Sequence, residues 1–110
     1  MSHHPPVVRK LGRGSRRGRR LVAAWAQRLR SREVALRRGG AMAWHSTNQR
    51  EELLICLSGR ATLEWRKDGQ APVPARVRLT AGQTLFLSAG TPHRVVNAGT
   101  GVLRYLYVTG

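Results

Sequence analysis

From residue 32 onward, apolar and polar side chains alternate in short runs that are separated by turn residues. In the clearest run, Ala61, Leu63 and Trp65 are each followed by a polar residue. Because successive side chains of a β-strand point to opposite faces, this period of two predicts half-buried strands. We expect strands over 32–37, 41–47, 52–57, 61–66, 76–80, 83–87, 93–97 and 102–108.

The segments between the expected strands are rich in turn residues. Gly39-Gly40 follows the first run, and Asp68-Gly69 is a strong signal for a hairpin turn. Pro72 and Pro74 favour a loop or edge position, because proline cannot donate a hydrogen bond to a central strand. About eight short strands with such turns indicate an all-β fold, a barrel or jelly roll, and there is no internal repeat.

The first 20 residues differ from the rest, since they contain seven basic residues and no acidic one. Such a run repels itself and has too few apolar side chains to form a core. We therefore expect a basic, flexible arm over residues 1–20 and a barrel domain over residues 21–110. Leu21–Trp25 fits either a short helix or a first edge strand, and the periodicity does not decide between them.

The formal net charge of the chain is +15, from 20 basic and five acidic residues. An excess of this size is typical of proteins that bind nucleic acid or an acidic partner. Only Lys10 and Lys67 are lysines, so the abundance of arginine can also reflect a coding bias. The arm lacks aromatic residues among its arginines, so its contacts would be with phosphates and would weaken with salt.

A length of 110 residues fits one domain, because a split would leave two undersized cores. No apolar stretch approaches the roughly 20 residues that a membrane-spanning helix needs, so we expect a soluble protein. The first residues lack the order of a secretory signal, which predicts a cytoplasmic location. The single cysteine, Cys56, cannot form an internal disulfide and fits a small buried core residue.

Three metal-competent residues, His45, Glu52 and His93, are spaced along strand-like runs that are otherwise apolar. Alternate residues of a strand share a face, so His45 points with Thr47, and His93 points with Asn97. If these faces line one barrel interior, the two imidazoles and the carboxylate converge. Two histidines and a carboxylate form a recognised ligand set for non-haem Fe(II), and they also suit catalytic zinc.

Glycines stand at regular distances around these three residues. The first segment contains Gly39, His45, Glu52 and Gly59, and the second contains Gly82, Gly90, His93 and Asn97. These spacings resemble the two motifs of the cupin family, G(X)5HXH(X)3–4E(X)6G and G(X)5PXG(X)2H(X)3N. The resemblance extends over most of residues 32–110 and implies a cupin-like jelly-roll β-barrel.

The chain departs from the cupin motifs at two positions. Thr47 stands where cupins usually carry their second histidine, and Ser88 stands where the second motif has proline. Ser88 changes the stiffness of a loop, whereas Thr47 removes one ligand from the usual set of three histidines and one glutamate. Thr47 could hold a water molecule instead, and Asn48 or Glu51 is an alternative ligand if the loop register differs.

The resemblance implies a divalent metal ion, Fe, Mn or Zn, held by His45, Glu52 and His93. In a cupin that has lost its metal, the two histidines would instead be hydrogen-bonded interior groups with Glu52 as their charge partner. An unpaired carboxylate inside an apolar barrel would cost several kcal/mol, which favours a cation beside it.

A site of this kind leaves room for water, O2 or a chelating small molecule such as a 2-oxo acid or a catechol. We expect the chamber to be lined by Thr47, Cys56, Phe86 and Tyr105 or Tyr107. The resulting hypothesis is a metal-dependent small-molecule enzyme of oxygenase or isomerase type. The alternatives are a ligand-binding or sensory module without activity, and nucleic-acid or acidic-partner binding through the arm. Cupins often form homodimers, and the sheet face with Leu53, Ile55 and Leu57 would serve here.

Overall fold

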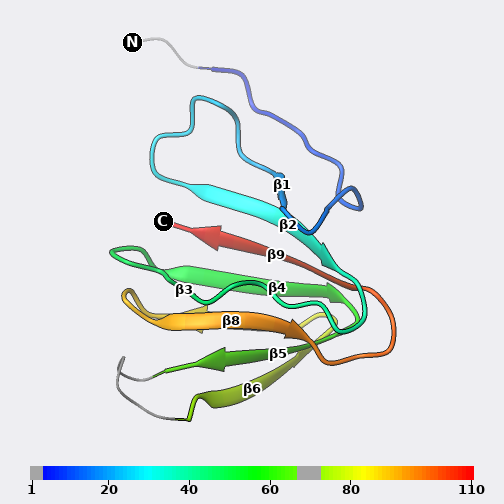
Figure 1. Ribbon diagram of the computed structural model, residues 1–110. Helices are drawn as coiled ribbons and strands as arrows, with labels where there is room; N and C mark the ends of the chain where they lie inside the picture. Colours follow the sequence, from blue (N-terminus) through cyan, green and yellow to red (C-terminus); the bar gives the residue numbers. More distant parts are fainter. Residues whose placement is uncertain (1–3, 67–72) are drawn as a thin grey trace.

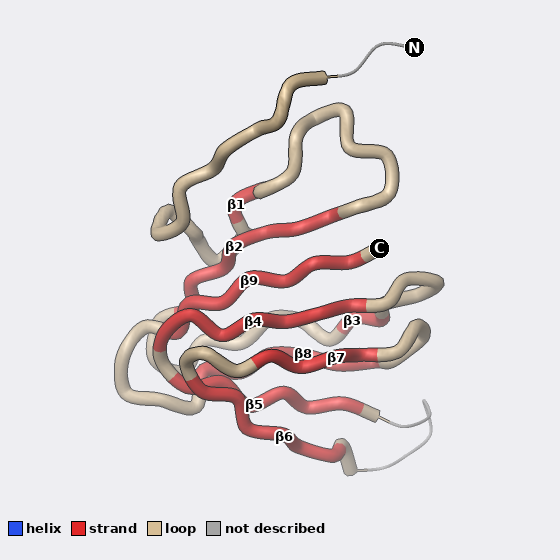
Figure 2. Tube along the Cα trace, turned by 180° about the vertical axis from the view of Figure 1, so that it is seen from behind, coloured by secondary structure: helices blue, strands red, loops and turns tan. Residues whose placement is uncertain are grey.

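A computed structural model describes residues 4–66 and 73–110 as an all-β protein of nine strands, which confirms the predicted fold class (Figures 1 and 2). The strands are β1 (Arg19–Arg20), β2 (Arg30–Leu36), β3 (His45–Ser46), β4 (Glu52–Ser58), β5 (Arg60–Trp65), β6 (Ala75–Thr80), β7 (Thr84–Leu87), β8 (Pro92–Asn97) and β9 (Leu103–Thr109). None of the described residues forms a helix that is long and apolar enough to cross a membrane. The expected Asp68-Gly69 turn lies outside the described residues.

The strands form two antiparallel sheets. The larger sheet has the order β1-β2-β9-β4-β7, and the smaller has the order β3-β8-β5-β6. In Figure 1 the strands of both sheets run across the molecule, with β2, β9 and β4 above β8, β5 and β6. Strands that follow one another in the chain therefore often lie in different sheets, as expected of a jelly roll.

The hydrophobic core lies between the two sheets and is built from alternate residues of their strands. Val34 of β2 pairs with Tyr105 of β9, which pairs in turn with Cys56 of β4, and all three side chains are buried. From the smaller sheet, Leu63 and Val95 pair with each other and complete the packing. The alternation in the sequence thus places one face of each sheet in the core.

Two of the expected elements take a different form. Only His45–Ser46 of the strand expected over 41–47 is a strand, with an isolated bridge between Ala41 and Val96 before it. Residues 21–25 form neither the helix nor the strand that the pattern allowed, because the chain turns away after Leu21 donates its amide hydrogen to the Ser31 carbonyl.

The described part of the N-terminal arm contacts the edge and the outer face of β2. The Gly12 amide donates to both carboxylate oxygens of Glu33, at 3.0 and 2.8 Å, and the Glu33 side chain is 0% exposed. Ser15 forms a parallel bridge with Val34, and Arg19 pairs with Glu33. The basic segment therefore packs against the barrel between residues 12 and 20, whereas the flexibility of the whole arm stays a prediction.

Two motif residues have structural roles in this fold. Gly59, between β4 and β5, has a φ of +86°, and a Cβ atom there would lie 2.7 Å from the Val102 carbonyl oxygen. Only glycine fits this position without displacing the neighbouring backbone. The buried Asn97 amide donates to the carbonyls of Leu36 and Gly101, so it holds the turn into β9.

Candidate metal centre

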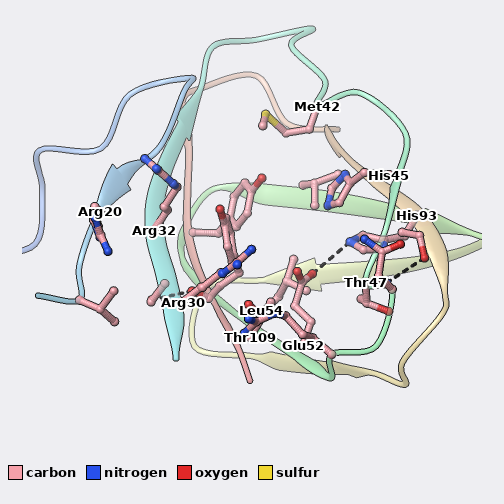
Figure 3. A pocket seen from close by; sticks show the side chains of 18 of the residues that line it. Arg20, Arg30, Arg32, Met42, His45, Thr47, Glu52, Leu54, His93 and Thr109 are labelled. Carbon is pink, nitrogen blue, oxygen red and sulfur yellow. Dashed lines mark hydrogen bonds and ion pairs between the residues drawn. The ribbon is translucent and has the colours of Figure 1, made fainter. Parts of the chain in front are cut away.

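His45, Glu52 and His93 meet between the two sheets, each supplied by a different strand (Figure 3). His45 on β3 and His93 on β8 are direct partners in register, and their ring centroids are 4.3 Å apart. Glu52 enters from the first position of β4, and its Oε2 lies 3.1 Å from Nε2 of His93. One potential ligand atom from each residue lies within 4.8 Å of the other two. The fold thus brings together the three residues that the sequence singled out.

Both imidazoles are oriented by their own backbone. Nδ1 of His45 lies 3.0 Å from the Ala43 carbonyl oxygen, and Nδ1 of His93 lies 2.8 Å from the Thr91 carbonyl oxygen. A carbonyl can only accept a hydrogen bond, so each Nδ1 carries the hydrogen and each neutral ring presents the lone pair of Nε2. Metal-binding histidines are commonly held in this way, with the second nitrogen bonded to a carbonyl.

The buried Nε2 atom of His93 has no hydrogen-bond partner of good geometry among the described residues. It faces the Glu52 carboxylate, and two lone pairs at 3.1 Å repel unless a proton or a cation lies between them. Burial acts to lower the pKa of His93. The negatively charged Glu52 beside it and the hydrogen bond to the Thr91 carbonyl together outweigh this effect, so the pKa of His93 lies above its usual value. The three residues therefore fit a cation, either a proton on His93 or a metal ion.

Thr47, at the usual second-histidine position, does not point its hydroxyl at this group. Its Oγ1 donates to the Ser88 carbonyl at 3.0 Å and accepts from the Thr91 amide at 3.1 Å. Thr91 is also the residue whose carbonyl orients His93. Thr47 thus holds the loop that precedes β8. Of the two alternative ligands, Glu51 is exposed and outside the metal-competent group, whereas Asn48 lines the neighbouring cavity.

We predict that Thr47→Val leaves metal stoichiometry unchanged but lowers the free energy of unfolding by about 0.5–1.5 kcal/mol, the usual contribution of a hydrogen-bonding group. Denaturant unfolding and elemental analysis measure the two quantities. Thr62→Val is the matched control, because Thr62 is half-buried and its hydroxyl has no hydrogen-bond partner among the described residues. Complete loss of metal from Thr47→Val would show that this hydroxyl acts as a ligand.

The metal-competent group lines one wall of a cavity of about 880 Å³. Tyr105 and Tyr107 line it as expected, and burial raises the pKa of both phenols, so they remain hydrogen-bond donors at neutral pH. Two expectations are wrong. Phe86 pairs with Leu53 on the outer face of the sheet, where it is 58% exposed, and Cys56 is buried in the core rather than in the cavity wall.

The cavity also contains arginines that the sequence pattern had not assigned to the site. Arg30 and Arg32 of β2 line it together with Arg20 and Arg50. The signal was present in the sequence, because Arg30 and Arg32 alternate with the same parity as Val34, which is a core residue. The net charge of the chain includes Arg30 and Arg32 but does not indicate that they face the cavity.

An antiparallel jelly-roll barrel with two histidines and a carboxylate between its sheets defines a candidate metal-binding β-barrel protein. The family model described as "Cupin domain" matches residues 32–109. The chain therefore belongs to the cupin family, which confirms the resemblance seen in its motifs.

Solved structures with the same fold come from distant organisms. The TT1209 protein of Thermus thermophilus has a TM-score of 0.68 at 22% identity, over 84% of this chain and 82% of that one. A conserved Streptococcus pyogenes protein of unknown function has a TM-score of 0.66 at 25% identity, over 84% and 70%. Drosophila melanogaster CENP-C bound to CAL1 has a TM-score of 0.67 at 13% identity, over 81% and 69%.

These likenesses support the fold rather than an activity. The chain spans only 50–61% of the length of several other matched structures, including a cysteine peptidase from Thevetia peruviana latex. A search of curated proteins found no match.

Proposed function

We propose that His45, Glu52 and His93 bind one divalent ion, Fe, Mn or Zn, and that the chain is a metal-dependent small-molecule enzyme of oxygenase or isomerase type. The observation that carries the proposal is the buried Nε2 of His93, which lacks a well-aligned hydrogen bond and faces a carboxylate beside a second imidazole. A divalent ion satisfies all three groups at once, whereas a proton satisfies only His93 and Glu52.

A divalent ion with three protein ligands retains open positions for water, O2 or a chelating substrate. The chain itself contributes a cavity whose lining includes the buried core residue Leu54. The phenols of Tyr105 and Tyr107 stand in the same wall and can donate hydrogen bonds to a bound molecule. The protein therefore supplies a partly apolar chamber with a few directed polar groups, as small-molecule sites usually have.

The reaction class can be tested with protein loaded separately with Fe(II), Mn(II) and Zn(II). Each form is mixed with 2-oxo acids and catechols, and O2 uptake is recorded in air while NMR follows isomerisation without O2. We expect turnover with at least one ion, and none in the Glu52→Gln variant. Metal-loaded protein that binds these molecules and converts none of them would contradict the enzymatic part of the proposal.

A ligand-binding or sensory cupin without activity is the second candidate. It is favoured by the lack of a second carboxylate, because Glu52 is the only acidic residue among those described that line the cavity. Binding without turnover would identify it. The CENP-C structure bound to CAL1 further indicates that cupin folds also occur in protein assemblies. A partner for the basic arm and a cytoplasmic location remain predictions.

We further infer a homodimer through the outer face of the larger sheet. Leu53 and Phe86 are direct partners there and are 40% and 58% exposed. Ile55, Leu106 and Val108 adjoin them in register and are partly exposed. The described arm contacts this face at Glu33 of β2 and Arg104 of β9, so the apolar patch around Leu53 and Phe86 is left for a second copy to bury.

The raised pKa of His93 predicts opposite pH dependences with and without metal. Because the pKa of His93 is raised in the folded protein, its pair with Glu52 stabilises the metal-free protein fully below the pKa of an unfolded histidine, about 6.5. This stabilisation is lost as the pH rises through the pKa of His93 in the folded protein. Metal needs the unprotonated ring, so its stabilisation grows over the same range.

Thermal unfolding from pH 5.5 to pH 8.5 measures this effect, at about 4–8 °C per kcal/mol. With chelator present, the difference in Tm between the wild type and Glu52→Gln should fall as the pH rises. With Zn²⁺ present, the rise in Tm that the metal gives the wild type should grow over the same pH range. Glu52→Gln is the control because it keeps the imidazole and removes its charged partner. A chelated wild type that gains stability relative to this variant on raising the pH would overturn the assigned pairing.

A further inference from the structure

The cavity wall opposite the two histidines is strongly basic. Figure 3 shows Arg20, Arg30 and Arg32 on the side formed by β1 and β2, with His45 and His93 across the cavity. Among the described residues, the lining of the whole cavity contains four arginines and a single carboxylate, that of Glu52. A concave site with one sign of charge concentrates ligands of the opposite sign.

The strand register brings two of these arginines close to Glu52. Arg30 pairs with Thr109 of β9, and Thr109 pairs with Glu52 of β4. Two strand spacings separate Arg30 from Glu52, about 10 Å between Cα atoms. Arg32 is the next inward-facing residue of β2, and it pairs with Tyr107 of β9. A small molecule can therefore reach both the arginines and the metal-competent group.

The positive charge of these arginines is not neutralised within the described part of the chain. The only ion pairs found there join Glu64 to Arg76 and Arg94, and Glu52 to His93. Arg32 donates to the Gly18 carbonyl at 2.8 Å, which uses one of its five N–H groups, and the Arg30 side chain forms no hydrogen bond or ion pair among the described residues. Charged groups that line a cavity without a counter-charge are suited to an anionic ligand.

We propose that the cavity binds a small organic anion whose carboxylate or phosphate group is held by Arg30 and Arg32, while the rest of the molecule extends towards His45, Glu52 and His93. The inference rests on the proposed function for this orientation and names the substrate class of the same site. Guanidinium groups match carboxylates and phosphates because two parallel N–H groups meet two oxygens. Arg20 and Arg50, from neighbouring segments, add to the field at the rim.

The test uses full-length protein treated with chelator, so that binding does not depend on metal. Succinate and inorganic phosphate are titrated by calorimetry into the wild type and the Arg30→Gln, Arg32→Gln and double variants. We expect each substitution to weaken the better probe on the order of tenfold, about 1.4 kcal/mol, since each removes a charge-assisted hydrogen bond. The probe that binds more tightly distinguishes a carboxylate ligand from a phosphate ligand.

Arg78→Gln is the matched control, because Arg78 is exposed, carries the same charge and lies on β6 away from the cavity. Its affinity should stay within about twofold of the wild type, as expected of general charge effects on an exposed site. An equal loss in Arg78→Gln would assign binding to net charge and overturn the inference, as would no binding of either probe at millimolar concentration. The Arg30 side chain forms no hydrogen bond or ion pair within the described residues, so Arg30→Gln remains informative if Arg32→Gln unfolds.

Failure of the metal proposal is distinguishable from failure of this one. Glu52→Gln should bind no metal but bind succinate at least as tightly as the wild type, because it removes the only negative charge that lines the described cavity. Wild type that cannot be loaded with Zn²⁺ but still binds succinate through Arg30 contradicts only the proposed function. Metal-loaded protein whose succinate affinity is unchanged by Arg30→Gln and Arg32→Gln contradicts only the anion site.

Discussion

Glu52→Gln is expected to reduce the divalent metal retained by the protein from about one ion per chain to background, although the substitution hardly changes the size of the side chain. The amide lacks the negative charge that balances the ion, and it leaves only the two imidazoles as ligands. His93→Ala should have the same effect, because it removes the buried nitrogen that faces Glu52. Elemental analysis after loading with Zn²⁺ and desalting measures the loss.

The neighbouring residue provides a matched control. Glu51→Gln makes the same chemical change one position earlier, but Glu51 is exposed and lies outside the metal-competent group. We expect Glu51→Gln to retain metal as the wild type does. Retention by Glu52→Gln together with loss from Glu51→Gln would show that the loop register differs and that the ligand set is wrong.

Phe86→Arg is expected to convert a homodimer into a monomer and so to halve the mass seen in sedimentation. The side chain is 58% exposed on β7, the edge strand beside the apolar patch residues of β4 and β9, and it is directly opposite Leu53. In a two-fold dimer each copy contributes the same patch, so one substitution places two like charges in the interface. A buried unpaired charge costs several kcal/mol, which is enough to dissociate an interface of ordinary affinity.

Val73→Arg tests whether any exposed apolar residue would have this effect. Val73 is 74% exposed and precedes β6 of the smaller sheet, so its substitution should leave the dimer intact. Sedimentation of the wild type at tens of micromolar comes first, because a monomeric wild type would itself remove the proposed dimer.

Much of this architecture could be predicted because each strand has one buried and one exposed face. The alternation around Leu63 and around Val95 placed their strands correctly, and both side chains are in the core. The spacing of glycines around His45, Glu52 and His93 carried more information, since it indicated which strands meet. Convergence across two sheets is a long-range property that local periodicity alone does not reveal.

The differences arise where tertiary contacts override the local pattern. The hydrophobicity of Phe86 favours a position inside the barrel. However, its neighbours Leu85 and Leu87 pair with Leu54 and Glu52, which face inward, and Phe86 must therefore point outward. A shift of one residue reverses every side chain of a strand.

The contacts of the arm and the position of the cavity arginines could not be predicted for a different reason. Charge density alone does not indicate that Glu33 on β2 accepts hydrogen bonds from the Gly12 amide. It also counts Arg30 and Arg32 with the basic excess, although their parity places them on the inner face of β2. A charge count contains no information about which side of a strand a residue faces.

The central claim is that His45, Glu52 and His93 together hold a metal ion, and a crystal structure of Zn²⁺-loaded protein tests it most directly. Anomalous scattering at the zinc edge locates the ion without reference to the protein atoms. We predict one peak about 2.0–2.2 Å from Nε2 of both histidines and from a carboxylate oxygen of Glu52. A crystal grown with excess Zn²⁺ that has no anomalous peak between these side chains would contradict the account.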